Sequence, residues 1–240
     1  MSSPTRLPSR RILEQRERIA MLIEDMEFSG FPGRDADHLP RLTYAGRVKW
    51  FRFRFELVFL TPFRRLVALE SPDCYVWLCV IDLAGSAVQA LANLSIGQGP
   101  DHAKFAAFLD RYLAGFAAAT LRLDDPRPDR NGAAAVSPAQ HFYKFFRSSL
   151  AHTFCIDWGG LQHREEIPNV GNSYLFATTQ GFAGEHGLGI IPREFVRDFE
   201  RGCENVLDAF ENAADGDPLR ASFEPTFNRV FLLKARAPIP

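Results

Sequence analysis

The sequence predicts a mainly α-helical fold with a minor β component, and three features support this prediction. Residues 102–123 repeat apolar side chains at i, i+3 and i+4 spacing over about four helical turns. Residues 74–96 form an apolar stretch with the length of a long buried helix. Residues 137–140 read Ser-Pro-Ala-Gln, a capping box with proline at the first helical position. We therefore expect a bundle of about four to six helices.

Composition and charge exclude several classes of protein. The 240 residues are 46% hydrophobic and 24% charged, which excludes a disordered or collagen-like chain. The 28 basic and 29 acidic residues give a net charge of −1, which excludes a uniformly basic nucleic-acid coat but allows a local basic patch. The four cysteines form no CxxC pair and have no histidine at metal-site spacing. We expect a cytoplasmic protein with reduced thiols, without a metal or a cofactor.

The first third of the chain combines a predicted helix with a predicted strand. Residues 1–9, rich in serine and proline, are expected to be a flexible tail, and residues 10–28 carry one apolar helical stripe. Residues 48–60 alternate phenylalanine with charged residues, which favours a strand, with a helix as the alternative. The Thr-Pro pair at 61–62 and the Ser-Pro pair at 71–72 each resemble a helix start.

The apolar segment 74–96 has the length of a membrane span, but its composition argues against that role. Asp82, Gln89 and Asn93 lie inside it, and each is costly in the hydrocarbon region of a bilayer. We interpret this segment as a buried bundle helix and expect no membrane contact.

The rest of the chain alternates loops with helices. Residues 124–136 are predicted to be an exposed loop, and residues 138–152 a helix opened by the capping box. Glycine and proline punctuate the next segment, which predicts a hairpin near 155–180. Residues 193–213 predict a last amphipathic helix, and residues 228–233 resemble a strand. No boundary separates two domains, so residues 10–240 are expected to form a single domain.

One face of the predicted helix 138–152 gathers polar side chains with useful chemistry. At about 100° per residue, five of them fall within an arc of about 140°: His141, Lys144, Arg147, Ser148 and His152. No acidic residue lies between 137 and 156 to neutralise them. Arginine offers a fixed fork of donors for a phosphate, and histidine can move a proton near neutral pH. This face therefore suits phosphodiester chemistry without a metal ion.

The run FYKFFRSSLAH, in which four residues separate Arg147 from His152, resembles the RxxxxH motif of HEPN-domain proteins. The preceding order, an apolar helix, the amphipathic helix KFAAFLDRYL and a loop, is similar to the helical succession of that superfamily. The resemblance covers about residues 72–210, which would be the core of a HEPN-like helical bundle. It implies a homodimer in which Arg147 binds the scissile phosphate and His152 acts as acid or base. Ser148 stands where the family often has asparagine.

The resemblance also implies a function. Many HEPN proteins are metal-independent endoribonucleases, and many act as toxins, with a cognate antitoxin, or in defence against phages. RNA or a nucleotide is the expected partner. The alternative is a non-catalytic HEPN-like module that binds RNA, a nucleotide or a protein. Independently of any family, Arg147 has a purely structural interpretation as the partner of a carboxylate such as Asp157, with His152 capping its helix.

A second candidate surface for RNA lies near the N-terminus. Residues 41–66 hold seven basic residues against one glutamate, and aromatic residues interleave with them. Such a surface grips a phosphate backbone and stacks bases, so Arg52 and Arg54 are candidate RNA-binding residues, together with Lys144 and His141. The alternative is an amphipathic element with a buried phenylalanine face. Residues 185–217 are correspondingly acidic, which makes self-association between unlike faces plausible.

Overall fold

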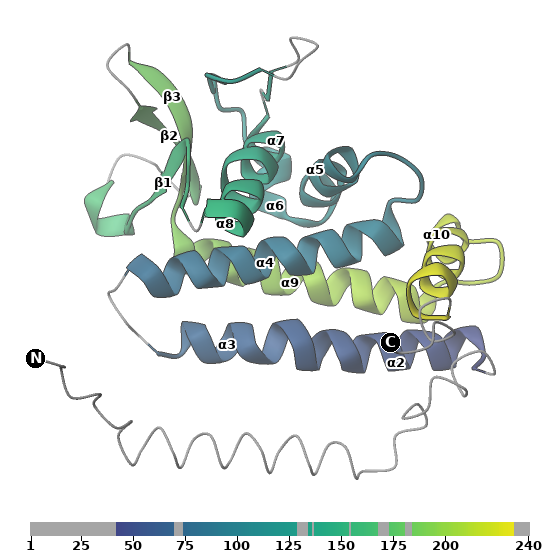
Figure 1. The fold of residues 1–240 in the computed structure, drawn as a ribbon. Coiled ribbons are helices and arrows are strands. Elements are labelled where there is room, and N and C mark those ends of the chain that lie inside the picture. Colours follow the sequence, from purple (N-terminus) through teal and green to yellow (C-terminus); the bar gives the residue numbers. More distant parts are fainter. Residues whose placement is uncertain are drawn as a thin grey trace, which may run out of the picture.

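The computed structural model describes residues 42–69, 74–128, 134–135, 137–153, 155–167, 173–180 and 184–232. The predicted tail, the predicted helix 10–28 and the predicted helix start at 71–72 lie outside these residues. The described part is mainly helical with a small three-stranded sheet, as the sequence predicts. Figure 1 shows a long N-terminal rod on one side of the central helices α4 and α9, with α5 to α8 and the sheet on the other side and α10 at one end of the bundle.

The N-terminal rod corrects the strand that was predicted for residues 48–60. It consists of α2 (Tyr44–Phe55), the π-helical turn η2 (Glu56–Leu60) and α3 (Thr61–Val67). Its first helix begins with a cap, because the Thr43 side chain accepts a hydrogen bond from the N–H of Gly46. The alternation of phenylalanine and arginine misled the prediction, because three of the four buried residues of α2 follow helical spacing: Val48, Phe51 and Phe55.

The Thr-Pro pair at 61–62 does not start a separate helix. The rod runs through it, and the N–H of Thr61 bonds to the carbonyl of Glu56, five residues earlier. Pro62 has no N–H to offer the carbonyl of Val58. A widened π turn beside a proline is one way for a helix to continue past such a missing bond.

The central helix α4 (Cys74–Ser95) is confirmed as a buried bundle helix. It contacts α3, α5, α9, α10 and η3, and its inward face is fully buried, as at Ile81, Val88 and Leu91. Among the described residues, Val76–Ser95 is the one stretch long and apolar enough to cross a membrane, and half of its window is buried inside the protein.

The helix predicted for residues 102–123 is broken into two pieces. These are α5 (Asp101–Tyr112) and α6 (Ala114–Ala118), separated by an extended backbone at Leu113 with φ −107° and ψ 112°. The break is stabilised from elsewhere in the chain, because Asp198 accepts hydrogen bonds from the N–H groups of Ala114 and Gly115. Apolar periodicity alone does not reveal such a contact.

The capping box at Ser137 is confirmed, with both of its hydrogen bonds present. It opens a continuous helical segment of α7 (Pro138–His141), the π-helical turn η3 (Phe142–Arg147) and α8 (Ser148–Thr153). The segment buries Phe142, Phe145 and Phe146 completely.

The small sheet follows, later in the chain than the predicted hairpin. Strands β2 (Leu175–Gln180) and β3 (Glu185–Ile190) pair antiparallel, and β1 (Gly159–Leu161) pairs parallel to β3. The prediction of a hairpin near 155–180 is therefore displaced: β1 belongs to that segment, but the antiparallel pair spans 175–190. A single 3-10 turn, η4 (Arg164–Glu166), follows β1.

The C-terminal elements complete the bundle. Helix α9 (Pro192–Asn212) confirms the predicted amphipathic helix, and α10 (Pro218–Phe227) leads into the π-helical turn η6 (Asn228–Leu232). The strand predicted from residue 228 is thus wrong over the described residues 228–232. The buried hydrophobic residues form one cluster, and the largest fully buried side chains in the described part are all phenylalanines.

Candidate functional site

The guanidinium of Arg147 has no carboxylate partner among the described residues, although it is packed against a neighbouring helix. Its aliphatic stem packs against α4 at Gly85, where an added Cβ would lie 3.1 Å from the Arg147 Cδ. The side chain is half-buried, its Nε atom is buried without a hydrogen-bond partner, and no ion pair forms to it among the described residues. Packing therefore positions the group while leaving its charge available for an anion.

Several arginines of the described part differ in this respect. Arg52, Arg64, Arg127 and Arg164 each form an ion pair with a carboxylate. In particular, the structural interpretation of Arg147 as the partner of Asp157 is wrong. Arg127 and Ser149 donate hydrogen bonds to Asp157 instead, and the bond from Arg127 is the main reason why the pKa of Asp157 is lowered.

The two other predicted catalytic residues belong to α8, which continues the helical segment of Arg147. Ser148 is half-buried and His152 is exposed in the last turn of that helix. His152 has no ion pair to a carboxylate within the described ranges. His152 is thus open to solvent and lies on the same helical segment as Arg147, which has no counter-ion among the described residues.

Lys144, a predicted RNA-binding residue, is neutralised by a residue of the preceding loop, 19 positions earlier in the chain. Its Nζ lies 2.6 Å from the Asp125 carboxylate and also donates to the carbonyl of Arg127. The Asp125 side chain is fully buried and accepts further hydrogen bonds from the N–H groups of Arg127 and Ala135. Although no acid lies between 137 and 156, the loop before the helix supplies one.

His141, the other predicted RNA-binding residue of this helix, is 0% exposed and is not on the surface. Neither of its ring nitrogens has a hydrogen-bond partner among the described residues, and the Phe145 ring lies 5.1 Å away. Burial lowers the pKa of His141, against smaller raising effects of the Ala135 backbone, Asp125 and Asp124. The predicted polar arc is therefore divided: His141 is buried, and Lys144 is paired with Asp125 of the preceding loop.

Lowering the pH from about 7.5 to about 5.5 is expected to reduce the free energy of unfolding through His141. In the unfolded chain this histidine titrates near its ordinary pKa of about 6.5, whereas burial lowers the folded pKa. Below about 6.5 the unfolded chain takes up a proton that the folded chain refuses, so stability falls as the pH falls. Urea denaturation at a series of pH values measures the effect. The His141→Gln variant should lose this part of the pH dependence, and an unchanged slope would contradict the assignment.

The basic N-terminal segment is compensated within the same chain. Arg52 forms ion pairs with Glu204 and Asp208 of α9, at 2.7 Å each. Arg64 pairs with Glu200 of the same helix, also at 2.7 Å. The two oppositely charged segments of the sequence therefore meet inside one molecule.

Arg54 differs from Arg52, although both were predicted to bind RNA. It is exposed, its guanidinium lies 5.7 Å from the centre of the Trp50 ring, and no carboxylate pairs with it in the described part of the chain. The Arg52 charge, in contrast, is satisfied by α9.

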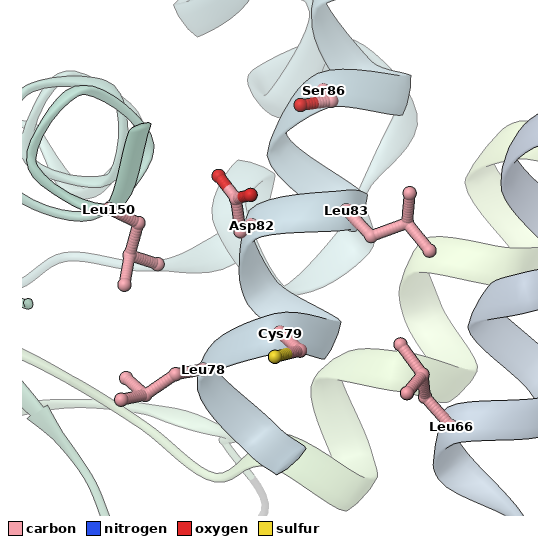
Figure 2. Close-up of a pocket in the computed structure, with 7 residues that line it drawn as sticks. All are labelled: Leu66, Leu78, Cys79, Asp82, Leu83, Ser86 and Leu150. Carbon is pink, nitrogen blue, oxygen red and sulfur yellow. The ribbon is translucent and has the colours of Figure 1, made fainter. Parts of the chain in front are cut away.

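A cavity of about 410 Å³ opens between α3, α4 and α8, beside the position of Arg147. Its lining combines four leucines with three polar groups: Leu66, Leu78, Cys79, Asp82, Leu83, Ser86 and Leu150. Figure 2 shows the Cys79, Asp82 and Ser86 side chains on the side of α4 that faces α8 and Leu150. Sequence reasoning missed this cavity. Its one available signal was a carboxylate inside an apolar helix, at Asp82.

The described residues contain no group of three or more histidine, cysteine, aspartate or glutamate side chains placed to hold a metal ion. Comparisons of the chain with protein-family models, with curated proteins and with solved structures found no match. The site is therefore defined by its own geometry, as an exposed histidine and an arginine with no counter-ion among the described residues, on one helical segment next to a mostly apolar cavity.

Proposed function

We propose that this protein is a HEPN-like, metal-independent endoribonuclease in which Arg147 binds the scissile phosphate and His152 moves the proton. The observation that supports this proposal is the state of Arg147. Its side chain is held against Gly85 by packing, and its guanidinium has no counter-ion among the described residues. A positioned cation without an internal partner is suited to a phosphate, because arginine and phosphate form paired, charge-assisted hydrogen bonds.

The chemistry follows from these groups. His152 takes the proton of a ribose 2′-hydroxyl, the 2′-oxygen forms a bond to the adjacent phosphorus, and the bond from phosphorus to the 5′-oxygen breaks. Arg147 stabilises the negative charge that develops on the phosphate oxygens. The products are a 2′,3′-cyclic phosphate and a 5′-hydroxyl. Ser148 donates a hydrogen bond to a phosphate oxygen, and in a homodimer the second copy's His152 protonates the leaving oxygen.

The proposed setting is the cytoplasm, where the protein acts as a toxin or defence factor under the control of a cognate antitoxin. The second candidate is a non-catalytic HEPN-like module that binds RNA, a nucleotide or a protein. The exposure of His152 favours this candidate, because a solvated imidazole becomes an efficient acid or base only when a substrate or second copy encloses it.

Cleavage of a generic RNA in EDTA tests the proposal. The Arg147→Ala and His152→Ala variants are each expected to lose about 10²-fold or more in rate, the usual effect of removing a charge-stabilising donor or a general base. Arg201→Ala and His102→Ala are matched controls, because both residues are exposed on other helices. Equal cleavage by all five proteins would reject the assignment, and RNA binding without cleavage would favour the second candidate.

A further inference from the structure

We propose that the cavity between α3, α4 and α8 is a nucleobase pocket that selects guanine through Asp82. This inference rests on the proposed function, since it assigns a base preference to the RNA that Arg147 binds. Its size agrees with such a ligand: about 410 Å³ lies within the range of about 300–1,000 Å³ for small-molecule sites. The leucines from three helices offer apolar contact to the faces of a planar base (Figure 2).

The position of the pocket relative to Arg147 favours a nucleotide over an unrelated ligand. The Arg147 stem packs on Gly85, which is the immediate neighbour of Ser86 and lies three residues after Asp82 on α4. Leu150, about one helical turn beyond Arg147, lines the pocket from the other side. A phosphate on Arg147 thus leaves the attached base beside the opening.

The choice of guanine comes from the chemistry of the polar lining. Asp82 is the one charged group that lines the pocket, and its carboxylate has no ion pair among the described residues. A carboxylate only accepts hydrogen bonds, and guanine alone among the four bases presents two adjacent N–H donors, at N1 and N2, on one edge. Adenine and cytosine place an acceptor nitrogen beside the amino group, and uracil has a single N–H there. The Ser86 hydroxyl completes the match as a donor to the guanine O6.

The negative charge of Asp82 also decides which part of a nucleotide enters. A phosphate is repelled from the carboxylate and attracted to the Arg147 guanidinium. The two groups therefore divide a nucleotide between them, with the phosphate at the helical segment of Arg147 and the base against α4.

Cys79 provides a direct probe of the pocket, because its thiol is exposed and lines it. In a Cys74→Ser background, guanosine is expected to slow the alkylation of Cys79 at least tenfold at saturation, whereas adenosine, cytidine and uridine leave it nearly unchanged. Cys155, also exposed, is the internal control and should react equally with every nucleoside. The Asp82→Asn variant should weaken guanosine protection about tenfold or more, as expected for the loss of a bidentate contact. The Asp110→Asn variant on α5 should retain it.

The outcomes separate this inference from the proposed function. Cleavage that depends on Arg147, with no guanosine protection or equal protection by all four nucleosides, overturns the guanine pocket and leaves the ribonuclease standing. Guanosine protection without RNA cleavage supports the guanine pocket and rejects the ribonuclease. Slow labelling of Cys79 without nucleoside also overturns the pocket if it speeds up on dilution, which indicates a second copy as occupant. The pocket proposal is also overturned if deletion of residues 1–41 accelerates the labelling of Cys79, because this indicates the chain's own N-terminal segment as the occupant.

Discussion

Replacing Phe142 by alanine is expected to lower the free energy of unfolding by about 3–5 kcal/mol. The Phe142 side chain is fully buried where several elements meet. Its ring centre lies 5.9 Å from Phe105 of α5, 5.6 Å from Phe116 of α6, 5.6 Å from Phe195 of α9 and 5.5 Å from Phe146 of the same π-helical turn. Alanine would leave a cavity that these four rings, three of them on other helices, cannot close without moving.

Urea denaturation measures the loss, and Phe142→Leu is the matched control. Leucine retains most of the volume, so its cost should stay below about 1.5 kcal/mol. A loss under about 1 kcal/mol for the alanine variant would show that the site collapses around the smaller side chain. Because Phe142 and Arg147 share the turn η3, the alanine variant should also lower RNA cleavage more than its folded fraction predicts.

Replacing Asp198 by alanine is expected to cost about 3 kcal/mol, because its carboxylate satisfies three donors at once. The side chain is 8% exposed and accepts hydrogen bonds from the Tyr174 hydroxyl at 2.7 Å, the Gly115 N–H at 2.8 Å and the Ala114 N–H at 3.2 Å. Burial raises the pKa of the Tyr174 phenol, so Tyr174 remains a donor. Alanine would leave these donors unsatisfied between α6, α9 and the sheet.

Chemical denaturation of three variants measures how much each hydrogen bond to Asp198 contributes to the free energy of unfolding. Tyr174→Phe removes one neutral donor and should cost about 0.5–1.5 kcal/mol. Asp198→Asn keeps the shape but turns an amide N–H₂ toward the backbone donors, so its cost should lie between the other two. If Asp198→Ala is no worse than Tyr174→Phe, the backbone of Ala114 and Gly115 finds other partners and the contact does not define the break at Leu113.

Local sequence signals predicted the elements that they encode by themselves. The capping box at Ser137 needs only residues within one helical turn, and both of its hydrogen bonds are present. The apolar stripe of α9 predicted an amphipathic helix, and the apolar composition of α4 predicted a buried one. The strand predicted at 48–60 was wrong because its residues satisfy two periods at once. Only contact with α9 and α10 shows which side chains are buried.

The candidate site was predictable in type but not in arrangement. A helix with Arg147, Ser148 and His152 was visible in the sequence. The pairing of Lys144 and the burial of His141 were not visible, because Asp125 approaches Lys144 from 19 residues away in the chain. Nor was the cavity, since its lining comes from three helices that are separate in the chain.

The sequence by itself determined the helical class, the burial of α4 and the basic and acidic segments, because composition, spacing and capping act over one or two turns. Only the tertiary structure decided which basic side chains form ion pairs within the chain and which do not. The carboxylates of α9 neutralise Arg52 and Arg64, the loop at Asp125 neutralises Lys144, and Arg147 is left without a counter-ion among the described residues. The physical reason is that an ion pair requires two groups within about 4 Å, a distance that folding sets between residues far apart in the chain.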